Sequence, residues 1–342
     1  FTLILTNYPA ANGSFSWMKN LRAMKKPIFF LTVAAIGLAV SFSSCKRVKE
    51  LLDPNIEQHN DDSNVLKTEM DQIDDDINNV INDIPGFGKT DETGQTFSSA
   101  MCGATIDTSQ IDQNILYFNF DGVTPCFSPS RTRSGQIKVE LTGGDHWYEA
   151  GAELTQTFTD FKITRLSDDR SVEFDGSRTL ENVNGYDWWL FLLGNQTIMY
   201  RARMVGMNVT FDNNLTAEWS TARTSEWTYT PNANDPDIPV AYLTFSANGD
   251  TVINGHANTD SWGVNRYGSN FVSYLNSAIT SNSYCGYWRP IGGQLVHEVE
   301  NNEYSLTLGV DQDGNQSTLD CAYGFKVAWD INGETNEQVF SY

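Results

Sequence analysis

Asn-Gly and Asp-Gly dipeptides separate short runs of β-forming residues along most of this chain. They favour type I′ hairpin turns, because both central residues of such a turn need positive φ, which glycine and asparagine adopt at low cost. Some of the runs alternate apolar and polar residues, as in Gln136 to Leu141, which is typical of a half-buried strand. The pattern predicts an all-β body of antiparallel hairpins, arranged as a sandwich or a meander in one or two domains. The dipeptides are Asp121-Gly122, Asp175-Gly176, Asn184-Gly185, Asn248-Gly249, Asn254-Gly255, Asp313-Gly314 and Asn332-Gly333.

One amphipathic helix is predicted before this body, over residues 61–84, and Pro85-Gly86 ends it. Its apolar residues recur in steps of three and four and therefore share one face. They are Leu66, Met70, Ile73, Ile77, Val80 and Ile84, and the acidic residues of the other face are Glu69, Asp71, Asp74, Asp75 and Asp76. We expect the apolar face to pack on the β body and the acidic face to be solvated. The alternative is a helix that docks a partner protein.

A change of composition at residues 230–237 suggests a division of the β body. This stretch contains two prolines and no apolar residue except alanine, so it predicts a linker or a long loop. We expect a first β domain over 97–230 and a second over 238–342. Residues 46–60 are polar and lack a sustained period, so they are predicted to form a tether ahead of the helix.

The cysteines of the body number four, and each half contains two. An even number in an exported chain suggests two disulfides, for which three pairings are possible. We favour Cys102–Cys126 and Cys285–Cys321, because each pair closes a short loop within its own half. Four buried free thiols are the alternative. A zinc site is not expected, since the sequence has no Cys-x-x-Cys pair.

The segment from Met24 to Cys45 has the layout of a secretory signal. Two lysines precede a short apolar run, Ile28 to Val40, and small residues then lead to the cysteine. The end of the segment, Ser43-Ser44-Cys45, resembles the signal of Bacteroidetes-type lipoproteins, although Phe42 stands where that family usually has leucine. The resemblance implies that residues 1–45 are a leader, that Cys45 carries lipid, and that the protein is anchored in the outer membrane. The alternative is an ordinary cleaved signal with an incidental cysteine.

The body also resembles a group of uncharacterised β-rich envelope lipoproteins. In the first half the resemblance rests on Cys126, on Arg131 to Ile137 and on Thr155 to Phe158. In the second half it rests on Cys285 before Pro290-Ile291-Gly292-Gly293, and on Asp320-Cys321 before Gly333. The group has no assigned activity, so the resemblance implies architecture and location only. Lys46-Arg47-Val48-Lys49 is basic where surface-exported members are often acidic, which leaves the cell surface and the periplasmic face both open.

The charge of the part after Cys45 is strongly negative. Four of the 22 Lys and Arg residues lie in the leader, which leaves 18 against 43 Asp and Glu, a net charge of −25. Such a surface repels nucleic acid and anionic lipid headgroups. A nucleic-acid partner is therefore not expected.

Motifs of catalysis are missing from the sequence. It has no Gly-x-Ser-x-Gly elbow, no His-Glu-x-x-His helix and no phosphate-binding glycine loop. His297-Glu298 lies in a strand-like run, and Asp311 to Asn315 fits a hairpin turn better than a calcium loop. We expect no cofactor and no metal site. A carbohydrate-active enzyme is the alternative, because 43 acidic residues allow paired carboxylates.

Aromatic residues give the candidates for ligand binding. Exposed rings stack on sugar faces, and two clusters combine rings with polar neighbours. They comprise Tyr186, Trp188 and Trp189 in the first half and Tyr287 and Trp288 in the second. Core packing of these rings is the alternative. The sequence favours a non-catalytic binding or envelope-structural protein with a possible polysaccharide ligand. The alternative hypotheses for the function are a carbohydrate-active enzyme and an accessory subunit of an outer-membrane complex, docked through the helix.

Overall fold

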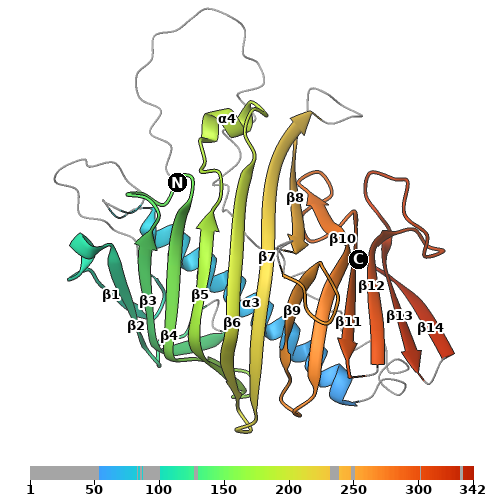
Figure 1. Cartoon of the computed structure of the whole chain (residues 1–342), viewed down its shortest axis with the longest axis horizontal. Helices are drawn as coiled ribbons and strands as arrows, with labels where there is room; N and C mark the ends of the chain where they lie inside the picture. Colours follow the sequence, from blue (N-terminus) through green and yellow to red (C-terminus); the bar gives the residue numbers. More distant parts are fainter. Residues whose placement is uncertain are drawn as a thin grey trace, which may run out of the picture.

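A computed structural model describes residues 54–82, 84, 87, 101–126, 130–231, 239–247, 251–300, 302–331 and 334–342. The described chain forms a single antiparallel sheet of 14 strands, crossed on one face by one long helix, α3 (Pro54–Ile81) (Figure 1). The prediction of an all-β antiparallel fold preceded by one amphipathic helix is therefore confirmed. The leader, Cys45 and the start of the predicted tether lie outside the described residues.

Strands that follow one another in the chain are mostly neighbours in the sheet, so the strand order is that of a meander. The exception is in the middle, where β8 and β9 lie end to end in the space between β7 and β10. The strands are β1 (Ala104–Asp107), β2 (Ile115–Asp121), β3 (Arg131–Thr142), β4 (Ala152–Arg165), β5 (Ser171–Asn182), β6 (Ile198–Phe211), β7 (Thr216–Pro231), β8 (Pro239–Ala247), β9 (Thr259–Val264), β10 (Asn270–Asn282), β11 (Gly292–Val299), β12 (Asn302–Val310), β13 (Gly324–Ile331) and β14 (Glu334–Ser341). The described residues also include two short helices, η2 (Ile111–Gln113) and α4 (Trp188–Leu192).

Hydrogen bonding of the sheet continues past the predicted linker. The second half of β7, from Arg223 to Pro231, pairs with β8, and Glu218 to Thr221 pair with β9. Residues 232–237 of that linker lie outside the described residues. The two predicted halves thus contribute to one sheet.

Helix α3 begins at Pro54, so the predicted start at residue 61 and the predicted tether through residue 60 are both wrong. Proline suits the first turn of a helix, because its φ is already helical and its missing N–H would have no partner there. The helix thus includes residues 54–60, which were not predicted to be helical, and His59 within them is fully buried. Burial against the sheet therefore stabilises turns whose sequence shows no apolar period.

The apolar face of α3 packs on the sheet and forms the main core with it. Leu66, Ile73 and Ile77 are buried among rings from the strands, including those of Phe118 and Phe161. The opposite face of the sheet is polar, as is usual for an antiparallel sheet with one solvated side. The expected packing of the helix is thus present, and the face that a docking helix would need is covered. None of the helices in the described residues has both the length and the apolar character of a membrane span.

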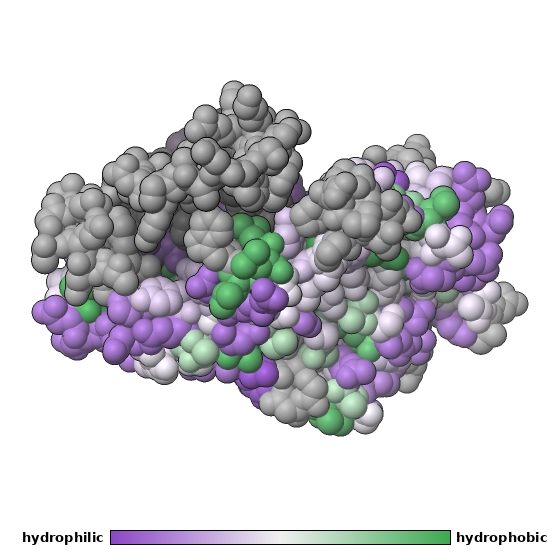
Figure 2. Space-filling view, turned by 90° about the horizontal axis from the view of Figure 1, so that it is seen from above, coloured by the Kyte–Doolittle hydropathy of each residue, from purple (hydrophilic) through white to green (hydrophobic). Residues whose placement is uncertain are grey.

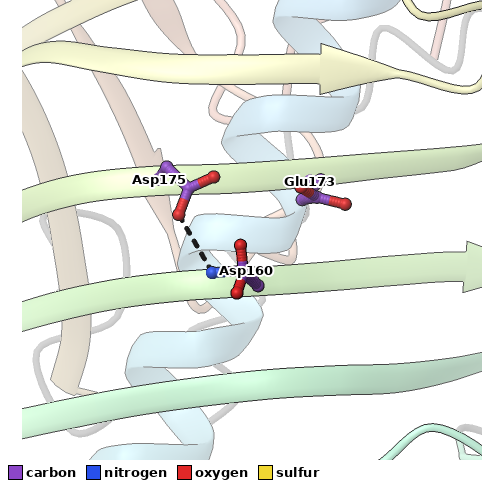
Figure 3. Close-up of side chains that lie close together, drawn as sticks. All are labelled: Asp160, Glu173 and Asp175. Atoms are coloured by element: carbon purple, nitrogen blue, oxygen red, sulfur yellow. Dashed lines mark hydrogen bonds between the residues drawn. The ribbon is translucent and has the colours of Figure 1, made fainter.

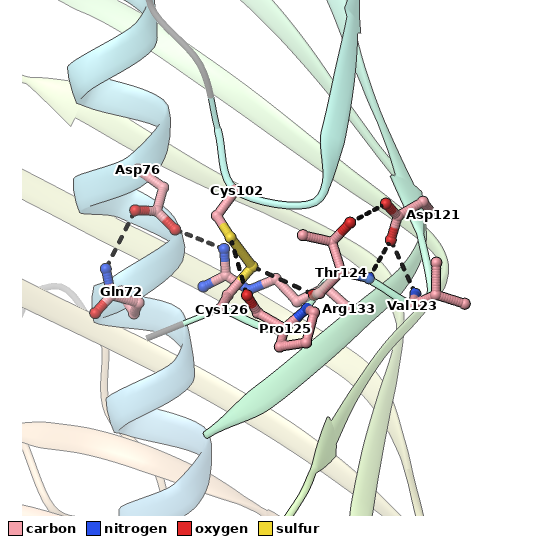
Figure 4. The surroundings of a disulfide bond; sticks show 9 residues. All are labelled: Gln72, Asp76, Cys102, Asp121, Val123, Thr124, Pro125, Cys126 and Arg133. Carbon is pink, nitrogen blue, oxygen red and sulfur yellow. Dashed lines mark hydrogen bonds and ion pairs between the residues drawn. A yellow bond between two sulfur atoms is a disulfide. The ribbon is translucent and has the colours of Figure 1, made fainter. Parts of the chain in front are cut away.

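Both flanks of α3 carry acidic residues that pair with arginines of the sheet. On one side Asp76 accepts a hydrogen bond from Arg133 of β3 at 2.5 Å (Figure 4). On the other side Asp74 accepts from Arg178 of β5, and from Gln156 at 2.9 Å. The expectation of a solvated acidic face is therefore wrong for these residues, because the strands to either side of the helix present cations to it.

The dipeptide Asp175-Gly176 does not form the predicted turn. It lies inside β5, where the pairing with β6 shifts register between Asp175 and Arg178. Gly176 has a φ of 142°, and its Cα faces Met207 so closely that an added Cβ would lie 3.1 Å from the methionine sulfur. The glycine thus serves a bulge within a long strand, which is the other common use of glycine in a sheet.

The two ends of the sheet differ in their connections (Figure 1). We call one the hairpin end, where short connections join the strands at 166–170, 212–215 and 265–269. The other is the loop end, whose longer connections are 143–151, 183–197, 283–291 and 311–323. Helix α3 runs obliquely from the hairpin end to the loop end.

Candidate ligand-binding site

All five aromatic candidates lie in connections of the loop end. Tyr186, Trp188 and Trp189 belong to 183–197, and Tyr287 and Trp288 belong to 283–291. Long loops that a rigid sheet positions are where binding residues are concentrated in many folds. The structure thus brings two clusters from distant parts of the sequence to one end of the molecule.

A disulfide joins two of these loops. Cys285 pairs with Cys321, with Cα atoms 5.4 Å apart, and Cys102 pairs with Cys126 near α3, with Cα atoms 5.9 Å apart (Figure 4). Both predicted pairings are therefore present. A hydrogen bond of 3.0 Å from Arg289 to the carbonyl oxygen of Ala322 also links the 283–291 loop to the 311–323 loop. The two loops form one cross-linked unit.

This unit displays exposed rings. Trp288 and Tyr284 are each 56% exposed, and Tyr323 on the other loop is 40% exposed. The Arg289 guanidinium lies 5.3 Å from the centroid of the Trp288 ring. An exposed ring beside hydrogen-bond donors has the chemistry for stacking on a sugar face. Tyr284 and Tyr323 were not predicted, and their closeness in sequence to Cys285 and Cys321 was the available signal.

Tyr186 and Tyr287 pack against the protein core and are not exposed binding rings. Both contact the same small core, which consists of Phe191, Ile198, Trp227, Leu243 and Phe245. The Tyr287 ring meets Trp227 edge-on at 5.2 Å, and the Tyr186 hydroxyl donates to Asn82 Oδ1 at 3.0 Å. Burial raises the pKa of Tyr186 to about 12. For these two residues the core alternative describes the structure better than the ligand-binding prediction.

Trp188 and Trp189 are the first two residues of the short helix α4. The N–H of Leu190 donates to Asp187 Oδ1 at 3.1 Å, a contact typical of a helix start. The side chains of both tryptophans lie outside the described residues, and their part in binding stays a prediction. Leu190, Leu192 and Leu193 of this segment are exposed. Figure 2, which looks onto the loop end, shows apolar surface there between polar regions.

Three carboxylates approach one another elsewhere, on the face of the sheet that α3 does not cover. Asp160, Glu173 and Asp175 have ligand atoms within 4.8 Å of one another, and the N–H of Asp160 donates to Asp175 Oδ1 at 2.9 Å (Figure 3). A bulge in β4 turns Asp160 toward β5. The general acid of a glycosidase needs an apolar surrounding that raises its pKa, whereas Asp160 is exposed and the other two are half-buried. The cluster is best described as surface acids gathered by a bulge.

A serine and a histidine also meet under α3. Ser273 Oγ and His297 Nδ1 are hydrogen-bonded, which is the contact that activates serine nucleophiles in hydrolases. Both residues are buried, however, and His59 of α3 stacks on the histidine ring. The burial of both side chains under the helix favours a packing role for this pair.

Comparison with protein-family models, curated proteins and solved structures found no match to this chain.

Proposed function

We propose that this protein is an outer-membrane-anchored lipoprotein that binds a glycan, or another extracellular polymer, through its loop end and without catalysis. The lipid anchor is assigned to Cys45, on the strength of the signal-like segment that precedes it. Support for binding comes from the cross-linked loops 283–291 and 311–323. Anchoring and binding are separate parts of the proposal and have separate tests.

The observation that carries the binding proposal is the exposure of Trp288. Large aromatic side chains usually bury most of their surface, because each can remove 150–250 Å² from water. Trp288 leaves 56% of its surface exposed, although the disulfide at Cys285 and the Arg289 contact hold its loop in place. A ring that a rigid loop holds in solvent is pre-organised for a flat, hydroxyl-rich ligand, since little ordering remains to oppose binding.

Affinity electrophoresis against a panel of polysaccharides tests the binding. We expect retention by at least one polymer, about fivefold weaker in Trp288→Ala, since an aromatic contact contributes ~1 kcal/mol. Tyr267→Ala is the matched control, because Tyr267 is an exposed ring at 45% but lies at the hairpin end. Equal loss in both variants, or no retention on any polymer, would contradict the glycan proposal. Release of reducing ends would support the carbohydrate-active enzyme instead.

Metabolic labelling with a fatty acid tests the anchor. We expect the label to enter the protein in the native host and to disappear in Cys45→Ala, because no acceptor thiol then precedes Lys46. Two or more acyl chains are needed for stable attachment, since a single chain binds only marginally. Labelling that persists in the alanine variant would rule out Cys45 as the anchor.

A further inference from the structure

Helix α3 is fastened to both ends of the sheet. In its first turns Asp62 accepts two hydrogen bonds from Arg266, at 2.7 and 2.5 Å, and Arg266 lies in the hairpin-end connection 265–269. Just past its last turn Asn82 accepts from Tyr186, which lies in the loop-end connection 183–197. The chain that precedes Pro54 therefore enters the fold at the hairpin end (Figure 1).

The length of chain before α3 is short relative to the sheet. Eight residues, 46–53, separate Cys45 from Pro54, and a fully extended chain spans at most ~3.6 Å per residue, or about 29 Å. Strand β7 has 16 residues, which at ~3.3 Å per residue extend about 50 Å. A lipid group on Cys45 thus stays within about 30 Å of the start of α3 and cannot reach the loop end, which lies about 50 Å from the hairpin end.

Charge opposes the remaining arrangement, in which the sheet lies flat on the bilayer. The chain after the leader carries a net charge of −25, and a bilayer surface with anionic headgroups repels such a protein. The uncovered face of the sheet is polar, so it gains little from contact with lipid. Attachment at one end and repulsion along the faces both favour an upright molecule.

We infer that the protein stands with its hairpin end toward the lipid bilayer and its loop end, with Trp288 and Tyr284, directed away from it. This orientation rests on the proposed lipid anchor at Cys45. It places the exposed rings about 50 Å from the membrane, given the length of β7. The polymer they would meet is therefore one that lies beyond the headgroups, and a membrane lipid is excluded as their ligand.

Energy transfer to a headgroup-attached acceptor dye tests the orientation. Acylated protein, purified from membranes of cells that express the full chain, is labelled at a single added cysteine and reconstituted in vesicles. Asp212→Cys places the donor at the hairpin end and Ala150→Cys places it at the loop end, and both positions are exposed. We expect transfer at least about threefold stronger from position 212, because the two ends are separated by the length of the strands.

Two results would overturn the inference, and they differ from each other. Equal transfer from both positions, or stronger transfer from position 150, in protein that remains vesicle-bound would mean that the anchor holds but the orientation is wrong. Protein that stays off the vesicles and shows no transfer from either position would mean that the anchor is absent. The Cys45→Ala variant is the reference for that second result.

Discussion

The ring of His59 in α3 stacks on the ring of His297 in β11, with centroids 4.4 Å apart. Trp219 of β7 and Phe271 of β10 enclose the same ring, with centroids 5.2 and 4.5 Å away. Within the described residues, neither nitrogen of His59 has a hydrogen-bond partner. Protonation of the His59 ring would place an unpaired positive charge in this buried setting, so we expect the attachment of α3 to depend on pH.

The first prediction concerns this dependence. Burial lowers the pKa of His59 to about 3, and the Lys67 ammonium adds to the shift, while burial also lowers the pKa of His297. The unfolded chain takes up protons first, near pH 6.5, so stability is full above that pH and falls as the pH drops toward 3. Each pKa unit corresponds to ~1.4 kcal/mol, and we expect a loss of about 3 kcal/mol between pH 6.5 and 4 from His59. Urea unfolding at several pH values measures it.

His59→Phe is the matched variant, because it keeps a stacked ring and removes the titration. Asp71 of the same helix has its pKa raised to about 6 by burial, so it favours folding as the pH falls and acts in the opposite direction. That contribution is common to both proteins and cancels in their difference. An unchanged pH dependence in His59→Phe would contradict the prediction.

The second prediction concerns the contact of Asp74 with Arg178. Asp74→Ala leaves a buried guanidinium without its carboxylate, and losing one partner of a buried pair costs about 3–5 kcal/mol. The double variant Asp74→Ala/Arg178→Met should recover part of the loss, because it removes the stranded charge. Asp168→Ala breaks an exposed pair with Arg165 and should change stability little. Similar losses in Asp74→Ala and Asp168→Ala would show that the helix contact adds no stability. Denaturant midpoints give all three values.

The third prediction compares two glycines of positive φ. Gly135 in β3 has a φ of 86°, and an added Cβ would lie 2.1 Å from the carbonyl oxygen of Asp160 in the bulge of β4. Gly151 has a φ of 81° with open space around it. Gly151→Ala should cost ~1–2 kcal/mol for the left-handed backbone alone. Gly135→Ala should cost about 2 kcal/mol more, because the sheet must move to relieve the overlap. Equal thermal stabilities of the two variants would mean that Gly135 does not approach the Asp160 carbonyl this closely.

The fourth prediction separates the two disulfides by function. Replacing either pair with serines should cost about 3–4 kcal/mol in the chain-entropy model, since the sequence separations are 24 and 36. Only the Cys285→Ser/Cys321→Ser variant should also lose polysaccharide retention, because that bridge holds the loops of Trp288 and Tyr323. Retention is measured at a temperature where both variants are folded. Loss of retention in the Cys102→Ser/Cys126→Ser variant as well would mean that the effect is global.

Local patterns predicted the parts of the fold that depend on local chemistry. The apolar period of α3 and the alternation in β3 are consequences of which face is buried, and both are visible in neighbouring residues. The pairing of Cys285 with Cys321 was predicted because the loop it closes is short. Trp288 was also predicted from local sequence, because polar and aromatic residues are its neighbours in the chain.

Features that depend on distant residues were not predictable. Pro54 to Asn60 are helical because the sheet buries His59, and nothing near that histidine in the sequence indicates it. Asp74 of α3 forms an ion pair because the fold places Arg178 of β5 beside it. Asp175-Gly176 forms a bulge because β5 continues on both sides of it. In each case the local pattern allowed two outcomes, and a contact made later in the chain decides between them.

The end-to-end arrangement of β8 and β9 has a consequence for how such sheets change over evolutionary time. Strand β7 and strand β10 each run the full height of the sheet and hold both short strands in register independently. An insertion or deletion within residues 251–258 would thus shift neither pairing, because in this described stretch the pairing is an isolated bridge between Ile253 and His256. Chains related to this one are expected to vary in length at that junction more than at the hairpins of the first half.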